Sequence, residues 1–209
     1  MKQKLFSIII LSVCLCINMA AQKKEVGSLT FSFGGVGKTH ASIRLKEAEV
    51  YKYHYNAFWN INAGYEKQFK GVFTFTELSY SHGTFDNYEL TGTSQWFDPE
   101  QKEDISSISL TQYIGATINK ISRFQIPLYF GIGGEYLTGG PLENFALHIA
   151  AKARMKYYFT TKIGMFVGIN GLYGLGFKSA SELGTQSADP YYTLSHGMWY
   201  FDAGLIIGL

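Results

Sequence analysis

Beyond residue 21 the chain has no uninterrupted apolar stretch long enough to cross a bilayer as a helix. Both cysteines, Cys14 and Cys16, lie before that point, so neither a disulfide framework nor a thiol nucleophile is expected in the remainder. Charged residues make up 16% of the chain, which is low beside the roughly 25% of soluble domains. Without Lys2 and Lys4 the basic and acidic residues are equal in number, so the sequence offers no basic field for nucleic acid.

The first 21 residues have the features of a secretory signal peptide. They start with lysines, continue with an apolar run over 5–17 that is too short for a transmembrane helix, and end in small residues suited to cleavage. A lipoprotein signal would lipidate one of the two cysteines, but each of them directly follows a bulky apolar residue. We therefore expect residues 1–21 to be removed and residues 22–209 to form a single domain.

What the sequence does contain is a repeated alternation of apolar and polar side chains, which predicts strands because successive side chains of a strand point to opposite faces. The predicted strands are 27–37, 50–65, 71–82, 105–119, 125–137, 144–159, 163–176 and 195–209. The links 66–70, 120–124 and 160–162 are short turns, 38–49, 83–104 and 177–194 are long loops, and 138–143 is intermediate. Eight such strands predict an all-β fold, an antiparallel up-and-down barrel that spans a bacterial outer membrane. Closure is needed there because only a closed barrel pairs every backbone group in lipid.

The direction of the apolar face separates this prediction from a secreted, soluble barrel that binds a hydrophobic ligand. A soluble barrel would cover its outer face with Lys and Glu, whereas few charges fall in the predicted strands. These are Lys52, Glu77, Glu135, Lys152, Arg154, Lys156 and Asp202. A polar face made mostly of Ser, Thr, Asn and Gly is better suited to a packed lumen, so the membrane barrel is favoured. The segment 71–82 fits less cleanly, because Phe73 and Phe75 share a face with Glu77.

Several stretches of the sequence are similar to those of one known group of proteins. They are the N-terminal signal, the eight alternating segments, Gln125-Ile-Pro-Leu-Tyr-Phe-Gly-Ile-Gly-Gly, Lys156-Tyr-Tyr-Phe and the closing Trp199-Tyr-Phe-Asp-Ala-Gly-Leu-Ile-Ile-Gly-Leu. With them the chain resembles the small porin-like outer-membrane β-barrel proteins of the OmpX and OmpA transmembrane-domain type. The resemblance implies an outer-membrane location, contact with outer-membrane lipid and handling by the barrel-insertion machinery. Such proteins often end in an aromatic residue, where this chain has Leu209.

Three glycine-rich stretches are superficially similar to nucleotide-binding motifs. In Phe33-Gly-Gly-Val-Gly-Lys-Thr39 the first glycine of a phosphate-binding loop is replaced by Ser32, and no helix is predicted after the motif. The glycines of 131–134 and 168–176 do not open a helix within a strand–helix–strand unit. We therefore expect no nucleotide and no other cofactor.

A lipid-modifying barrel enzyme, of deacylase or acyltransferase type, is an alternative. It would need a serine beside a histidine that a carboxylate orients. Three fragments supply the residue types: His40-Ala-Ser42 with Glu47 or Glu49, Ser81-His82 with Asp86, and Ser195-His196. None has a distinctive spacing, so we interpret them as hydroxyls and histidines at the roots of loops.

The five histidines, His40, His54, His82, His148 and His196, all fall toward the long-loop end of the predicted barrel. Imidazole is the commonest metal ligand, and His54, His148 and His196 lie on the polar face. However, no two of them are close in sequence and their strands are not neighbours. No metal site is predicted.

The sequence thus favours an integral surface protein with a structural or interaction role, since eight strands enclose only enough space for side chains and not a general pore. We expect the lumen to be closed by a charge network of Glu77, Glu135, Lys152, Arg154 and Asp202. We expect the loop 83–104 to face outward and to be the candidate interaction site, through Trp96, Phe97, Asp98, Glu100, Glu103 and Asp104. An external partner cannot be named from these residues.

Overall fold

The computed structural model describes the backbone of residues 27–44, 50–69, 72–90, 95–97, 103–121, 123–139, 144–179 and 191–209. The predicted signal peptide lies outside these residues. The strands are β1 (Gly27–Arg44), β2 (Val50–Phe69), β3 (Val72–Leu90), β4 (Gln95–Phe97), β5 (Glu103–Ile121), β6 (Phe124–Thr138), β7 (Asn144–Tyr158), β8 (Ile163–Ser179) and β9 (Tyr191–Gly208).

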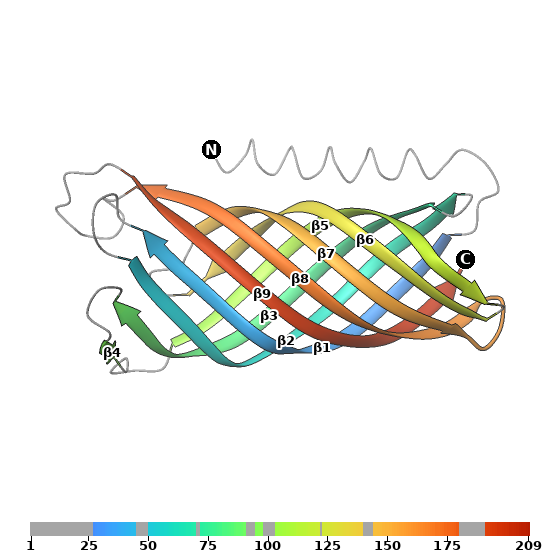
Figure 1. Cartoon of the computed structure of the whole chain (residues 1–209), viewed down its shortest axis with the longest axis horizontal. Coiled ribbons are helices and arrows are strands. Elements are labelled where there is room, and N and C mark those ends of the chain that lie inside the picture. The colour runs from blue at the N-terminus through green and yellow to red at the C-terminus, as the bar shows by residue number, and fades with distance from the viewer. Residues whose placement is uncertain are drawn as a thin grey trace.

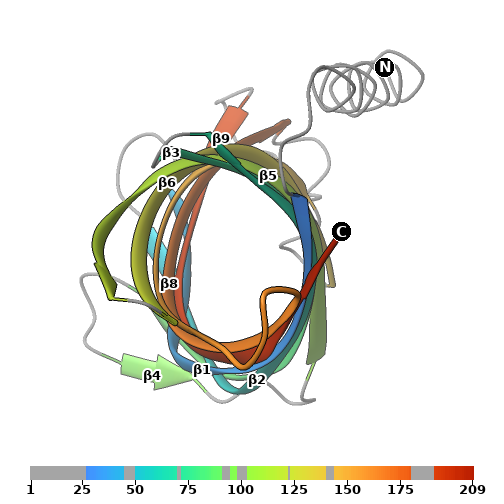
Figure 2. The ribbon, with the colours of Figure 1, turned by 90° about the vertical axis from the view of Figure 1, so that its right-hand side faces the viewer.

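Eight of these strands form a closed antiparallel barrel. Hydrogen-bonded neighbours follow the order β2-β1-β9-β8-β7-β6-β5-β3, and β2 also pairs with β3, so the ring has no open edge. Figure 1 shows the strands running obliquely along the barrel, and Figure 2 shows the ring along its axis. The short β4 lies outside the ring and pairs with residues 88–90 of β3. The predicted fold, an eight-stranded up-and-down barrel, is confirmed.

The stagger of the ladder can be followed around the ring. Starting at Phe75 and stepping to the paired residue of each neighbouring strand in turn, the path returns to β3 at Phe85, ten residues further along. A stagger of this kind tilts the strands against the barrel axis and fixes the width of the barrel. It also brings side chains that are far apart in the sequence to one level of the lumen.

The strands extend further into the predicted loops than the alternation indicated. β1 continues through residues 38–44, β3 through 83–90, and β9 begins at Tyr191 instead of residue 195. At the other end β2 runs to Phe69, so most of the predicted turn 66–70 is strand. The predicted strands are shorter because the added residues do not continue the regular alternation of apolar and polar side chains.

The apolar face points outward. Phe130, Ile132, Leu147 and Ile149 are each between 64% and 70% exposed, while the neighbouring side chains of Tyr129, His148 and Ala150 are buried. The interior contains Thr, Ser, Asn and paired charges. A closed ladder with an apolar outside and a polar inside is the construction of a membrane-spanning barrel, and it opposes the soluble alternative. Among the residues described, no helix is long and apolar enough to cross a membrane.

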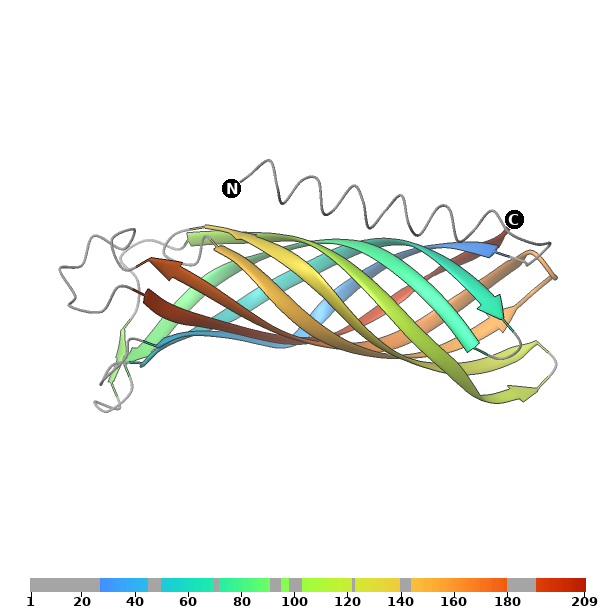
Figure 3. The same ribbon diagram turned by 90° about the horizontal axis from the view of Figure 1, so that it is seen from above.

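The short connections and both described chain ends lie together at one end of the barrel (Figure 3). There the amide of Leu209 donates to the carbonyl of Gly27 at 2.9 Å, and the amide of Gly208 donates to the carbonyl of Lys162 at 2.6 Å. Lys162 belongs to the turn between β7 and β8. The C-terminal ends of β1, β3, β6 and β8 are at the opposite end, as the alternation of short and long links predicts.

Candidate functional site

Four charged side chains meet in the lumen. Glu77 comes from β3, Lys152 and Arg154 from β7, and Asp202 from β9, and each is at most 3% exposed. Lys152 Nζ donates to both carboxylate oxygens of Glu77. Arg154 Nη2 donates to Glu77 Oε2 at 2.9 Å and lies 3.4 Å from Asp202 Oδ2. Two cations and two anions therefore balance each other across the barrel.

Polar side chains of β1 and β2 extend this network to the facing wall. Ser32 Oγ donates to Asp202 Oδ2 at 3.0 Å, and Asn62 Nδ2 donates to Ser32 Oγ at the same distance. The hydrogen bonds thus link β1, β2, β3, β7 and β9. A buried charge is costly unless it is paired and hydrogen-bonded. Removing one member of this network would therefore leave a buried charge of another member without its partner.

Aromatic rings fill the space around the charges. The guanidinium of Arg154 lies 4.6 Å from the ring centre of Phe75 and 4.0 Å from that of Phe166. Its Nε and Nη1 have no hydrogen-bond partner among the described residues, so these atoms face the rings instead. Arg commonly stacks on aromatic faces in this way.

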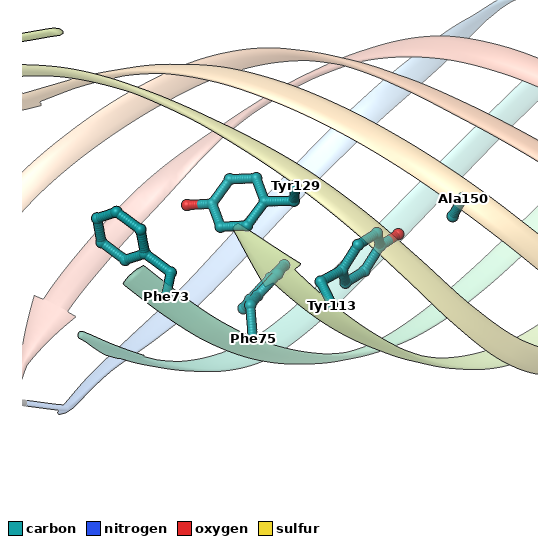
Figure 4. Close-up of a cluster of buried hydrophobic side chains, with 5 residues drawn as sticks. All are labelled: Phe73, Phe75, Tyr113, Tyr129 and Ala150. Carbon is teal, nitrogen blue, oxygen red and sulfur yellow. The ribbon is translucent and has the colours of Figure 1, made fainter. Parts of the chain in front are cut away.

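Figure 4 shows the aromatic cluster, formed by Phe73, Phe75, Tyr113, Tyr129 and Ala150. Phe75 stacks on Tyr113 with ring centres 5.5 Å apart, and Phe73 meets Tyr129 edge-on at 6.0 Å. This explains the irregular pattern of 71–82. Phe73 and Phe75 point into the lumen together with Glu77, as neighbours of the charges and not as part of the lipid-facing surface.

A second ion pair lies nearer the short-turn end, and the sequence analysis did not include it. Lys156 Nζ donates to the two oxygens of Glu66 at 2.5 and 2.6 Å, and Tyr129 Oη donates to Glu66 Oε2 at 2.5 Å. Glu66 had been assigned to a turn, whereas it is a buried residue of β2. The sequence signal for Glu66 is its spacing: it follows Asn60 and Asn62 by an even number of residues, which places all three on the same face of a strand.

Glu135 was expected in the charge network, and the structure gives it a different partner. Its Oε2 lies 3.2 Å from Nδ1 of His196, and both side chains are buried. His148 is also in the lumen, with Nε2 2.8 Å from Thr111 Oγ1. Among the described residues, no group of three or more His, Cys, Asp and Glu is arranged to hold a metal ion.

The candidate interaction residues do not form one loop. Trp96 and Phe97 belong to β4, paired with Glu89 and Tyr88 of β3. Glu103 and Asp104 are strand residues of β5, paired with Phe85 and Thr84, which corrects their assignment to the loop 83–104. Asp98 and Glu100 lie outside the described residues.

The serine–histidine fragments are separated by the alternation of the strands. Ser81 is buried in the lumen, whereas His82 is on the outward face. His196 is inward and bound to Glu135. The side chains of His40, Ser42 and His54 lie outside the described part of the chain. His82 does meet a serine, Ser106 of the neighbouring strand, at 3.0 Å, a partner that only the strand register could reveal.

Comparisons with known proteins find similar folds. The chain matches no protein-family model and no curated protein sequence. Among solved structures it is similar to the outer membrane protease OmpT of Escherichia coli, with 8% identity, a TM-score of 0.48, and coverage of 90% of this chain and 98% of that one. It is also similar to Neisserial surface protein A, with 10% identity, a TM-score of 0.43, and coverage of 88% and 99%. The attachment invasion locus protein Ail of Yersinia pestis gives 11% identity, a TM-score of 0.43, and coverage of 88% and 100%.

At these identities and TM-scores, no property of these proteins is carried over to this chain. The location of the chain follows from its own construction, a closed antiparallel barrel whose outer face is apolar and whose lumen is polar. Barrels of this kind span the bacterial outer membrane. The chain is an outer-membrane β-barrel protein.

Proposed function

We propose that this protein is a non-conducting outer-membrane barrel with a structural or surface-interaction role, which it performs by holding the connections of one barrel end outside the cell. The observation that carries the proposal is the ionic cross-link of Glu77, Lys152, Arg154 and Asp202 in the lumen. A general pore would leave this space to water and solute.

The energetics of the lumen support a closed barrel. Each charge of the cross-link is buried and has a partner of opposite sign, as is required where water does not replace a lost partner. The rings of Phe75 and Phe166 flank Arg154, and the pair of Glu66 and Lys156 closes the level below. An ion would have to displace several paired groups at once to pass.

The lengths of the strands support a surface role. β1, β2 and β3 have 18, 20 and 19 residues, whereas a tilted transmembrane strand needs about 9–11. Outer-membrane barrels place their short turns in the periplasm. The excess length then carries the ends of the strands, with β4, beyond the outer lipid surface, where a partner could bind.

Planar-bilayer recording tests the closed lumen. The refolded protein should give no steady conductance, and the variant Glu77→Ala/Arg154→Ala should conduct more, because it removes two buried, paired side chains from the lumen. Ser106→Ala, on the outer wall, is the matched control and should behave as the unchanged protein. A stable channel of porin size in the unchanged protein would show the proposal to be wrong.

Cysteine labelling tests the orientation of the barrel in the membrane. Because the chain has no cysteine after residue 21, only an introduced cysteine can react there. Asp104, near the start of β5, and Lys162, in the turn between β7 and β8, are both exposed and lie toward opposite ends of the barrel. On intact cells a bulky, membrane-impermeant maleimide should label Asp104→Cys and should label Lys162→Cys only after lysis. The reverse pattern would mean that the long connections face the periplasm.

A further inference from the structure

The outer wall of the barrel carries a hydrogen-bonded serine and histidine that the lumen does not use. Ser106 Oγ of β5 lies 3.0 Å from Nδ1 of His82 on β3, and these two residues are direct partners in the strand register. The hydroxyl of Tyr80 lies 3.2 Å from the same Ser106 Oγ. Both members of the pair are partly exposed, on the face opposite to the lumen.

An aromatic side chain of β2 fixes the position of the imidazole. The ring of Trp59 lies 5.5 Å from that of His82 and 5.6 Å from that of Tyr80. Packing against the Trp59 ring restricts the rotation of His82, so its Nδ1 stays directed at Ser106. Trp59 thus supplies the orientation that a carboxylate gives to many catalytic histidines.

The pair lies at a boundary between apolar and polar surface. Toward the short-turn end the same outward face continues with Leu78 and Ile108, which are 52% and 56% exposed. Toward the long-loop end it continues with Thr84, whose hydroxyl donates to Asp104 Oδ1 at 3.2 Å. In a bilayer the acyl ester groups of lipids lie at the junction of hydrocarbon and headgroup. The apolar residues on one side of Ser106 and the polar residues on the other match such a junction.

We propose that Ser106 and His82 are a nucleophile and general base that hydrolyse an acyl ester of a lipid lying against the barrel wall. Residues Leu78 and Ile108 would contact the acyl chain, and Thr84 and Asp104 would face the polar headgroup. This activity goes beyond the proposed surface role and does not depend on whether the lumen conducts.

The reaction follows from the contacts of the two side chains. His82 Nδ1 accepts the proton of Ser106 as Oγ bonds to the ester carbonyl carbon, and the Tyr80 hydroxyl can donate to the oxyanion that forms. The carbon–oxygen bond to the lipid alcohol then breaks, and that alcohol takes the proton from His82. A water molecule, deprotonated by His82, then attacks the acyl carbon. The bond from that carbon to Ser106 Oγ breaks, Oγ takes the proton back from His82, and the fatty acid leaves. Asp104, on the same outward face, adds a negative charge near the imidazolium.

The test uses the folded barrel in detergent micelles, with a fluorophosphonate that modifies activated serines and with p-nitrophenyl palmitate as the ester. Peptide mass spectrometry should locate the phosphonate on Ser106. Ser106→Ala should abolish labelling and ester cleavage, and His82→Phe should lower cleavage by about 10²–10⁴-fold, the usual contribution of a general base. Tyr80→Phe should lower turnover while leaving Ser106 reactive.

Ser81→Ala is the matched control, because Ser81 adjoins His82 in the sequence but points into the lumen. It should keep full labelling and cleavage. The heat-dependent shift of the folded barrel in gel electrophoresis shows that each variant is folded. If folded protein leaves Ser106 unlabelled, or if Ser106→Ala cleaves the ester as well as the unchanged protein, the pair is a structural hydrogen bond of the membrane interface and the proposal is wrong.

Discussion

Replacing Glu77 with glutamine should unbalance the central charges of the lumen while keeping the size of the side chain. Glu77 is 1% exposed and accepts hydrogen bonds from both Lys152 and Arg154. Without its charge, the two cations have only Asp202, which lies 3.4 Å from Arg154. One buried positive charge is then left uncompensated.

The expected loss is large. Removing one partner of a buried ion pair costs about 3–5 kcal/mol, because the remaining charge stays away from water without compensation. Replacing Lys152 with methionine in the same chain restores the balance, leaving Arg154 opposite Asp202. The double variant Glu77→Gln/Lys152→Met should therefore be less destabilised than the sum of the two single variants, by about 0.5–3 kcal/mol.

The measurement is the free energy of unfolding in urea, with the barrel inserted in lipid vesicles and unfolding followed by tryptophan fluorescence. Asp104→Asn is the control, because Asp104 is exposed, and surface substitutions usually stay within about 0.5 kcal/mol. The reasoning fails if Glu77→Gln costs less than about 1 kcal/mol, or if the two single losses simply add in the double variant.

The same unfolding measurement checks three further changes. Phe75→Ala should cost about 3–5 kcal/mol, since the ring is fully buried; a loss below about 1 kcal/mol would mean that lipid-exposed packing alone sets stability. Gly204→Ala should destabilise the barrel, because an added Cβ would lie 2.7 Å from the Cβ of Ser32. Gly171→Ala should be tolerated, since nothing lies within 4 Å of its added Cβ. Equal losses of stability in the two variants would contradict the close packing around Gly204. Tyr129→Phe should cost about 1–3 kcal/mol by leaving a buried carboxylate oxygen of Glu66 with one donor fewer, and an unchanged midpoint would argue against that hydrogen bond.

The alternation of side chains was sufficient to predict the barrel, because a period of two is repeated in every strand that has one face in lipid. It failed at the strand ends. There Thr84 of β3 pairs with Asp104 of β5. Outward-facing polar residues such as these are as common in loops as in strands that extend beyond the lipid, so the sequence does not distinguish the two. Backbone pairing extends these strands where the regular apolar–polar alternation no longer marks them.

The contents of the lumen were predicted by residue type but not by partner. Lys152 and Arg154 were placed on the inner face, yet the position of Glu66 beside Lys156, and of Glu135 beside His196, depends on the stagger of the ladder. The same is true of Ser106 and His82. One strand alone contains no information on which residue of the next strand lies opposite, so these pairs required the register.

Closure of the ring by β1 and β9 has a kinetic consequence. Ser32 and Asp202, which share a hydrogen bond, are separated by 170 positions in the chain, so the seam cannot form until the last strand is available. Folding of this barrel therefore ends with its longest-range contact, and such contacts make folding slow. Until then β1 and β9 each have an edge with unpaired backbone N–H and C=O groups. In lipid no water is present to hydrogen-bond with these groups, and in water they can pair with another chain. An assembly factor that covers the edge of β1 until β9 arrives would shorten the period in which the chain is open to aggregation.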